Sequence, residues 1–420
     1  MLTGRDIIYI SSIEWNFLWQ QNQEIAIRLA RAGNRVLYIE NTGVRAPGLG
    51  DAGRVFARLK SWIGKLGSSG VREVAPNLYV CSPLVLPPFG SQTRRLINRR
   101  LLLPLVRRAA QSLQFRDALI WTYLPTDTAR DLIRLFKSPK SAVVYYCLAD
   151  FPQLSANPEH IEQSEKSLVE SSDVVFANCT KLAQRLGQWT DNVHVFPPGV
   201  DLSVFPDQEK ETNFSAAVLA DENREVIESF PKPVIGYMGG LHKHIDFDLI
   251  VKMAASRPDW SWVFVGPFQA PVEKLQGATN IHLLGTRPHE LLISYLRTFD
   301  VCIVPYLKTA YTETVVPVKI NEYLAAGKPI VSTSLPTVCE FNERHHILTT
   351  TENDPAAFLT GIEDALRRPT DRLTMARRRE VAALLDWQVI VEKMSDLLET
   401  AATTPRGLPA REHRVAGKNT

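Results

Sequence analysis

The 420-residue sequence lacks any apolar run near the roughly 20 residues that a helix needs to span a bilayer. Its first apolar run, residues 6–10, is also too short for the hydrophobic region of a secretory signal. Only five cysteines occur, and no two of them form a CxxC pair, so no zinc or dithiol motif is present. We therefore predict a cytoplasmic protein without zinc-ribbon or thiol-redox chemistry.

Charge is unevenly distributed along the chain. Residues 1–200 carry a net charge of +8 and residues 201–420 a net charge of −5, which together give the overall +3. Such asymmetry indicates that the first half faces an anionic partner and that the two halves have different roles. Nucleic acid is a poor candidate for that partner, because the second half is acidic and no groove-reading or base-stacking module is visible.

Two basic segments account for the positive first half. Residues 54–66 place their apolar side chains on one helical stripe with arginines and lysines around it, the pattern of a helix in a membrane interface. Residues 94–116 carry seven arginines and no acidic residue. These segments predict contact with an anionic membrane surface. The alternative is a pair of helices that pack on the domain with solvated basic faces.

Short apolar runs alternate with helix-length segments in both halves of the chain. Most runs are continuous, which is typical of parallel strands covered on both faces. Residues 197–201 (PPGVD) have the composition of a linker, residues 372–400 of a helix, and the polar residues 403–420 of a disordered tail. The pattern predicts an α/β protein with two Rossmann-like, doubly wound domains and a ligand in the cleft between them. The predicted strands lie at 6–10, 35–40, 118–122, 142–147, 173–177, 193–196, 233–239, 261–266, 281–285, 300–306 and 329–333.

The densest chemical signal lies in residues 311–327. Pro317 suits the first turn of a helix, and Gly327 suits its end. Free N–H groups at the helix start would attract a phosphate, and Lys319 adds a full charge there. Glu322 lies three residues later on the same face and can accept hydrogen bonds from ribose hydroxyls. The alternative is an ordinary intrahelical Lys–Glu pair.

A second candidate follows the predicted strand at 233–239. Gly239 and Gly240 would let backbone approach a phosphate closely, and His242, Lys243 and His244 add donors or charge nearby. A tight turn without a ligand is the alternative.

Three weaker candidates lie elsewhere. Arg287 follows another predicted strand and can reach a phosphate or line a base pocket, or it is a surface arginine. Glu14, Trp15, Asn16 and Trp19 follow the first strand, where an aromatic ring can stack on a sugar face, or Trp15, Phe17 and Trp19 are simply core. Asp150 follows a strand of the first half and either faces the cleft or caps a helix.

Taken in order, five motifs resemble the donor-binding domain of GT-B glycosyltransferases of the group 1, or family 4, kind. Residues 195–340 match that pattern well, and residues 1–195 match it more loosely. The motifs are PPGVDLSVF (197–205), GYMGGLHKHIDFDLI (236–250), FVGP (264–267), NIHLLGTRPHELLISYLRTFDVCIVPY (280–306) and PVKINEYLAAGKPIVSTSLP (317–336).

The resemblance implies a domain organisation. Residues 1–200 would bind the acceptor and residues 201–385 the nucleotide diphosphate-sugar donor. Residues 386–402 would form a C-terminal helix that returns towards the first domain, ahead of the tail at 403–420. Such enzymes usually need no metal ion and retain the anomeric configuration, so no cofactor is expected besides the donor substrate.

The resemblance also assigns roles. Lys319 would neutralise the departing diphosphate, Glu322 would hold the ribose, and Gly239 and Gly240 would lie against the phosphates or the sugar. The remaining predicted donor-binding residues are Lys243, Arg287, Tyr311, Thr312, Glu313 and Thr314. Glu14, Trp15 and Asp150 are the predicted acceptor-side residues.

The sequence departs from the family pattern at two places. The family commonly has two glutamates separated by seven residues; Glu322 matches the second, but Thr314 occupies the first position, with Glu313 one place away. The usual R-x4-K arrangement after the glycine turn is absent. Either Lys319 and Arg287 carry the diphosphate largely alone, or activity is reduced.

These observations favour a cytoplasmic glycosyltransferase, peripheral on the inner membrane, that acts on a lipid-linked or cell-surface polysaccharide precursor. One alternative is a sugar-nucleotide 2-epimerase of the same fold, which would need no membrane face. The other is a noncatalytic GT-B protein that serves as a scaffold in a polysaccharide-assembly complex, which would bind a donor weakly or not at all.

Overall fold

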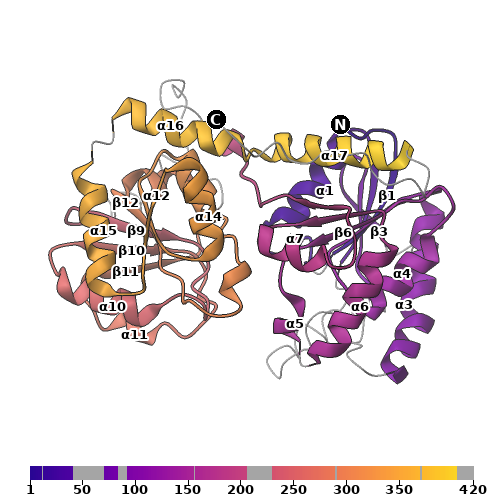
Figure 1. Cartoon of the computed structure of the whole chain (residues 1–420), viewed down its shortest axis with the longest axis horizontal. Coiled ribbons are helices and arrows are strands. Elements are labelled where there is room, and N and C mark those ends of the chain that lie inside the picture. Colours follow the sequence, from indigo (N-terminus) through magenta and orange to yellow (C-terminus); the bar gives the residue numbers. More distant parts are fainter. Residues whose placement is uncertain are drawn as a thin grey trace.

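The computed structural model describes residues 1–11, 13–40, 71–83, 92–155, 157–205, 229–288, 291–368 and 371–403. The predicted basic segment 54–66 and residues 404–420 of the predicted tail lie outside the described residues. The described chain forms two α/β domains, each built on its own sheet (Figure 1).

The first domain contains an eight-stranded sheet in the order β3-β4-β2-β1-β5-β6-β7-β8. Every neighbouring pair is parallel except β3 and β4, which form an antiparallel edge. The strands are β1 (Asp6–Ile10), β2 (Arg35–Ile39), β3 (Val71–Ala75), β4 (Leu78–Cys81), β5 (Leu119–Thr122), β6 (Val143–Cys147), β7 (Val174–Ala177) and β8 (Val193–Val195). The helices are α1 (Gln21–Arg31), α3 (Gln92–Ser112), α4 (Asp127–Phe136), α5 (Phe151–Leu154), α6 (Pro158–Ser171) and α7 (Thr180–Leu186).

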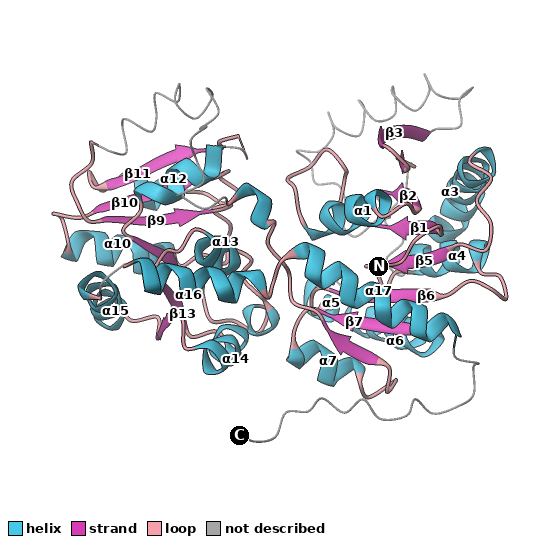
Figure 2. Ribbon diagram, turned by 90° about the horizontal axis from the view of Figure 1, so that it is seen from above, coloured by secondary structure: helices cyan, strands magenta, loops and turns pink. Residues whose placement is uncertain are grey.

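Side chains of the first sheet alternate between two separate cores. Ile7 and Tyr9 of β1 belong to a cluster that also contains residues of α1 and α17 (Trp387–Thr403). Ile8 and Ile10 belong to a cluster that contains residues of α3, α4 and α6. Because successive strand residues point to opposite faces, helices cover both faces of this sheet (Figure 2), as the continuous apolar runs predict.

The second domain contains a six-stranded, wholly parallel sheet in the order β11-β10-β9-β12-β13-β14. Its strands are β9 (Val234–Met238), β10 (Ser261–Val265), β11 (Ile281–Gly285), β12 (Val301–Val304), β13 (Ile330–Thr333) and β14 (Thr349–Thr351). Its helices are α10 (Phe247–Ser256), α11 (Glu273–Gln276), α12 (Leu292–Thr298), α13 (Lys319–Ala325), α14 (Pro336–His345), α15 (Pro355–Arg367) and α16 (Arg372–Ala383), with short 3-10 turns η2 (Leu202–Val204) and η4 (Thr312–Thr314). The prediction of two doubly wound domains is confirmed.

The chain passes between the domains twice, and the two passages lie side by side. The Val200 N–H donates to Leu385 O (2.9 Å), and the Trp387 N–H donates to Val200 O (3.0 Å). After the second passage α17 packs on the first domain beside α1, with Trp387 and Met394 in the core (Figure 1). The second domain is therefore joined to the first by two adjacent chain segments at one edge of the interface.

Candidate functional site

A cavity of about 490 Å³ lies between the two domains. Its wall combines the start of α1, the linker Pro198–Phe205, the end of β9 with the turn after it, and the start of α13. The contributing ends of β9 and α13 lie at the carboxyl edge of the second sheet. In doubly wound domains this edge is where ligands bind, and the observed cavity occupies it.

Lys319 and Glu322, predicted to act together, lie on this wall. Lys319 is the first residue of α13, and its Nζ lies 3.2 Å from Glu322 Oε2. The side chains retain 26% and 19% of their exposure, so both groups face the cavity rather than the protein core. Since α13 has only seven residues, the ammonium charge of Lys319 rather than a helix dipole is the main attraction for an anion here.

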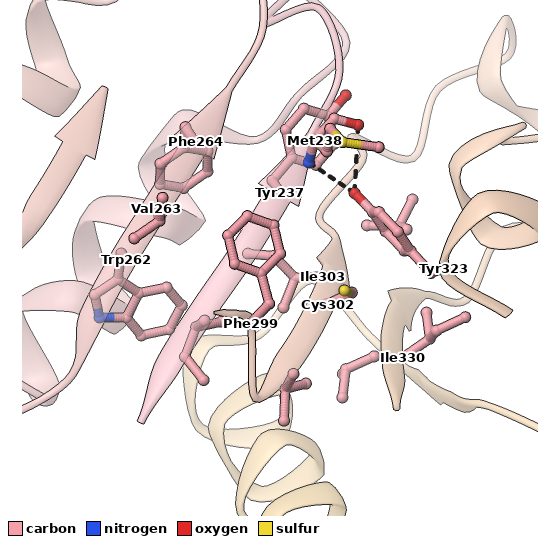
Figure 3. Packing of buried hydrophobic residues seen from close by; sticks show 14 of the residues in the cluster. Tyr237, Met238, Trp262, Val263, Phe264, Phe299, Cys302, Ile303, Tyr323 and Ile330 are labelled. Atoms are coloured by element: carbon pink, nitrogen blue, oxygen red, sulfur yellow. Dashed lines mark hydrogen bonds between the residues drawn. The ribbon is translucent and has the colours of Figure 1, made fainter. Parts of the chain in front are cut away.

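Packing inside the second domain fixes the start of α13 against the end of β9. The hydroxyl of the buried Tyr323 accepts a hydrogen bond from the Met238 N–H (2.8 Å; Figure 3). Asn321 on the same helix donates through Nδ2 to Pro198 O in the linker (2.7 Å). These two contacts hold Lys319 over the turn that follows β9.

The glycine turn after β9 lies directly beneath Lys319. A Cβ added at Gly239 would lie 2.7 Å from Lys319 Cε, and one added at Gly266 would lie 2.1 Å from Gly239 O. Both residues have positive φ, +154° and +144°. Glycine is therefore required for this close approach of backbone and side chain. Gly240, next in the turn, lines the cavity.

His242 also lines the cavity, although the sequence favoured Lys243 beside it. Burial, the nearby His244 and the charge of Lys319 lower the pKa of His242 to about 4. The His244 N–H donates to His242 Nδ1 (3.3 Å), and the His244 ring stacks on Tyr311 with centroids 4.3 Å apart. Lys243 is exposed and lies outside the cavity lining as the structure describes it.

The loop before α13 does not bring its predicted donor-binding residues into the described lining of this cavity. Thr312 and Glu313 line a separate hollow at the ends of β12 and β13. Glu313 forms an ion pair with Lys181 of α7 in the first domain. Thr314 is buried, and its hydroxyl donates to Tyr311 O (3.3 Å). Because η4 turns the chain here, the displaced Glu313 does not substitute for a glutamate at position 314.

Arg287 likewise lies outside the described lining of the cavity. Its Nε donates to Tyr295 Oη (3.1 Å), and its Nη1 donates to Thr286 O (3.1 Å). Tyr295 is fully buried, so this contact holds the arginine against its own domain. Of the two cations that the sequence proposed for the diphosphate, the structure places only Lys319 on the cavity wall.

Of the first-domain residues that the sequence singled out, the described cavity lining contains Trp19 but not Glu14, Trp15, Asn16 or Asp150. Trp15 packs edge-on against Tyr38 and Trp19, and its backbone N–H donates to Glu40 Oε2 (2.6 Å). Glu14 and Asp150 lie outside the described cavity lining; Asp150 precedes α5 at its N-cap, where its carbonyl accepts from the Gln153 N–H (3.1 Å).

Trp19 and Glu24 lie on that wall; the sequence singled out Trp19 but not Glu24. The indole N–H of Trp19, which is 45% exposed, donates to Glu24 Oε2 (2.6 Å). Glu24 Oε1 accepts from Arg28 Nε (2.7 Å), and Arg28 also pairs with Asp201 of the linker (3.2 Å). The signal in the sequence was the run QNQE (21–24), four polar residues at the start of an otherwise amphipathic helix, of which three are buried in the fold.

Among the described residues, no helix is both long and apolar enough to cross a membrane. No three or more histidine, cysteine, aspartate or glutamate side chains gather there in an arrangement suited to a metal ion. Metal-independence remains a prediction.

Comparison with known proteins identifies the second domain. Residues 232–368 match the family described as Glycosyl transferases group 1. This segment is a group 1 glycosyltransferase domain. It contains the glycine turn, Lys319 and Glu322, and the resemblance noted in the sequence is confirmed.

A curated relative extends the similarity. The chain is 27% identical over 239 residues to a Bacillus subtilis (strain 168) protein, TuaH, whose name assigns it to teichuronic acid biosynthesis as a glycosyltransferase. This match covers 56% of the chain and 57% of the relative, so the chain spans little more than half the length of that protein.

Solved structures define the fold. Sucrose-phosphate synthase from Thermosynechococcus elongatus aligns with a TM-score of 0.68 at 18% identity, over 94% of this chain and 99% of the other. Anabaena Alr3699/HepE in complex with UDP and glucose aligns with a TM-score of 0.62 at 16% identity, over 94% and 100%. The group 1 domain of this chain is therefore one half of a GT-B fold.

Proposed function

We propose that the chain is a glycosyltransferase that moves a sugar from a nucleotide diphosphate-sugar to a lipid-linked or cell-surface polysaccharide precursor, with retention of anomeric configuration. The Lys319–Glu322 pair carries this proposal, since it lies over Gly239 on the wall of the interdomain cavity, within the group 1 domain.

The chemistry of transfer explains why a lysine is needed there. When the bond between the anomeric carbon and the diphosphate oxygen breaks, negative charge accumulates on the leaving diphosphate. An ammonium fixed beside it stabilises that charge more in the transition state than in the ground state. Glu322, three residues along α13, holds Lys319 in place and would accept hydrogen bonds from the ribose hydroxyls of the donor. We propose that this arrangement works without a metal ion.

The relatives guide the choice of substrates. Alr3699/HepE was solved with UDP and glucose, so uridine nucleotides are the first donors to test. TuaH is named for the synthesis of teichuronic acid, which supports a cell-surface polymer precursor as the acceptor of this chain.

The surface of α3 supports the membrane-associated part of the proposal. Leu96, Arg100, Arg107 and Arg108 are exposed and lie on one broad face of the helix. Two other arginines of the same segment, Arg95 and Arg99, are instead held by Asp131 in the domain. Two of the seven arginines of residues 94–116 are thus used within the domain, and the exposed basic face suits a peripheral position on the anionic inner membrane.

Calorimetric titration with UDP, GDP and their sugars tests the donor site. We expect one nucleotide to bind at micromolar concentration. Lys319→Ala and Glu322→Ala should each weaken binding by about tenfold or more, because each removes a hydrogen bond to a charged group. Lys252→Ala, which removes an exposed lysine on α10, is the matched control. Absence of binding by the unaltered protein would contradict the proposal and favour a noncatalytic scaffold.

A further inference from the structure

His242 supplies the cavity with a nitrogen donor beside Lys319. The two residues line the same cavity, and the charge of Lys319 is close enough to lower the pKa of the imidazole. His242 also follows the glycine turn directly, two residues after Gly240. His242 therefore lies in the stretch after the glycine turn. Members of the family usually have the R-x4-K arrangement in this stretch, and this chain lacks it.

Contacts of the ring fix its orientation. The backbone N–H of His244 donates to His242 Nδ1 (3.3 Å), and the ring stands edge-on to Tyr306 with centroids 5.4 Å apart. Tyr306 is itself buried, at 7% exposure, so this face of the ring is held by the domain core. An imidazole that accepts through Nδ1 carries its proton on Nε2 when neutral.

The proton on Nε2 remains available to a ligand. In the parts of the chain that the structure describes, no group accepts a hydrogen bond from His242 Nε2. Burial, His244 and Lys319 all disfavour the charged ring and lower its pKa to about 4. At neutral pH the group is consequently a fixed, uncharged donor that does not repel the neighbouring ammonium.

We propose that His242 donates a hydrogen bond from Nε2 to an oxygen of the donor's diphosphate, next to Lys319. The inference rests on the proposed function, since it needs a nucleotide diphosphate in this cavity. It divides the binding of the diphosphate between one charged and one neutral donor. This division compensates in part for the missing arginine and lysine after the turn.

The test compares two substitutions of the same residue. His242→Phe keeps a ring of similar size without the donor, whereas His242→Gln keeps an N–H at the position of Nε2. The probe is whichever of UDP, GDP and dTDP binds the unaltered protein, titrated by calorimetry. We expect binding to weaken about tenfold in His242→Phe and to stay within about threefold in His242→Gln. His345→Gln on α14, whose ring packs on Phe341, is the matched control.

Binding of the free nucleoside, measured by saturation-transfer NMR, tests whether the site remains folded. It lacks phosphates and should bind all four proteins equally. Equal diphosphate binding by His242→Phe and the unaltered protein would overturn the inference while leaving the proposed function standing. Loss of nucleoside binding in His242→Phe, or equal losses of diphosphate binding in Phe and Gln variants, would assign His242 a packing role and overturn it too. Failure of every diphosphate to bind the unaltered protein would overturn both.

Discussion

At the scale of single residues, contacts with other elements of the fold decide which side chains reach the cavity. Lys319 and Glu322 could be found because helical spacing places i and i+3 on one face, and the structure brings them within 3.2 Å. Glu313 and Trp15 had suitable side chains, but turns direct them elsewhere, towards Lys181 and Tyr38. Such directions depend on tertiary contacts that local sequence does not encode.

His242 gives a residue-scale prediction about pH. Its pKa is about 4 in the folded protein, whereas the ordinary value of a histidine, which applies in the unfolded chain, is 6.5. Between these values the unfolded chain binds a proton that the folded chain does not, so the stability that neutral His242 contributes is complete above about pH 7 and declines towards pH 4. The melting temperature should therefore fall more between pH 7.5 and pH 5 in the unaltered protein than in His242→Gln.

The pKa values of other histidines are lowered as well, which is why the comparison between the two proteins matters. Burial lowers the pKa of His194, His244, His282 and His345 as well, and all four remain in both proteins. The contributions of His194, His282 and His345 largely cancel in the difference, whereas His244 contacts His242, so the difference reports on this pair. Parallel declines of the two melting temperatures would show that the environment of His242 is not the one described.

At the scale of elements, continuous apolar runs located the buried parallel strands. The sequence analysis missed three strands. One of them, β4 (LYVC), is a short apolar run that is mostly buried, whereas β3 and β14 lack such runs. β3 (VREVA) is an antiparallel edge strand with no fully buried residue, and β14 consists of three half-buried threonines. The predicted helix at 372–400 is divided into α16 and α17 at Leu384–Asp386. The break occurs because these residues pair with Val200 where the chain returns between domains, a long-range contact that periodicity cannot report.

The exposed basic face of α3 allows a prediction at this scale. Replacing Arg100, Arg107 and Arg108 with alanine should release the protein from vesicles that contain anionic lipid, since each basic residue near such a surface contributes about 1 kcal/mol. Co-sedimentation with vesicles at increasing salt measures the effect. The control replaces three exposed cations of the second domain, Lys274, Arg344 and Arg367. Equal binding by both triple variants would contradict a specific role for α3.

At the scale of the whole molecule, the two passages of chain between the domains determine what the cavity can hold. The linker at Pro198–Phe205 forms part of the cavity wall, and Arg28 and Asn321 reach it from opposite domains. Lys181 and Glu313 form a further contact across the interface. The sequence predicts two domains and a cleft. The side chains that meet across the cleft are determined by the relative placement of the domains.

The most direct test of the account is release of nucleoside diphosphate from nucleotide sugars. The full chain is incubated with UDP-, GDP- and dTDP-sugars, first with water as the acceptor and then with a polyprenyl diphosphate-linked sugar in vesicles. The account predicts that one donor is consumed, that EDTA leaves the rate unchanged, and that Lys319→Ala lowers it about a hundredfold or more by removing the charge opposite the leaving group. Undiminished release by Lys319→Ala, or no release from any donor with either acceptor, would contradict it.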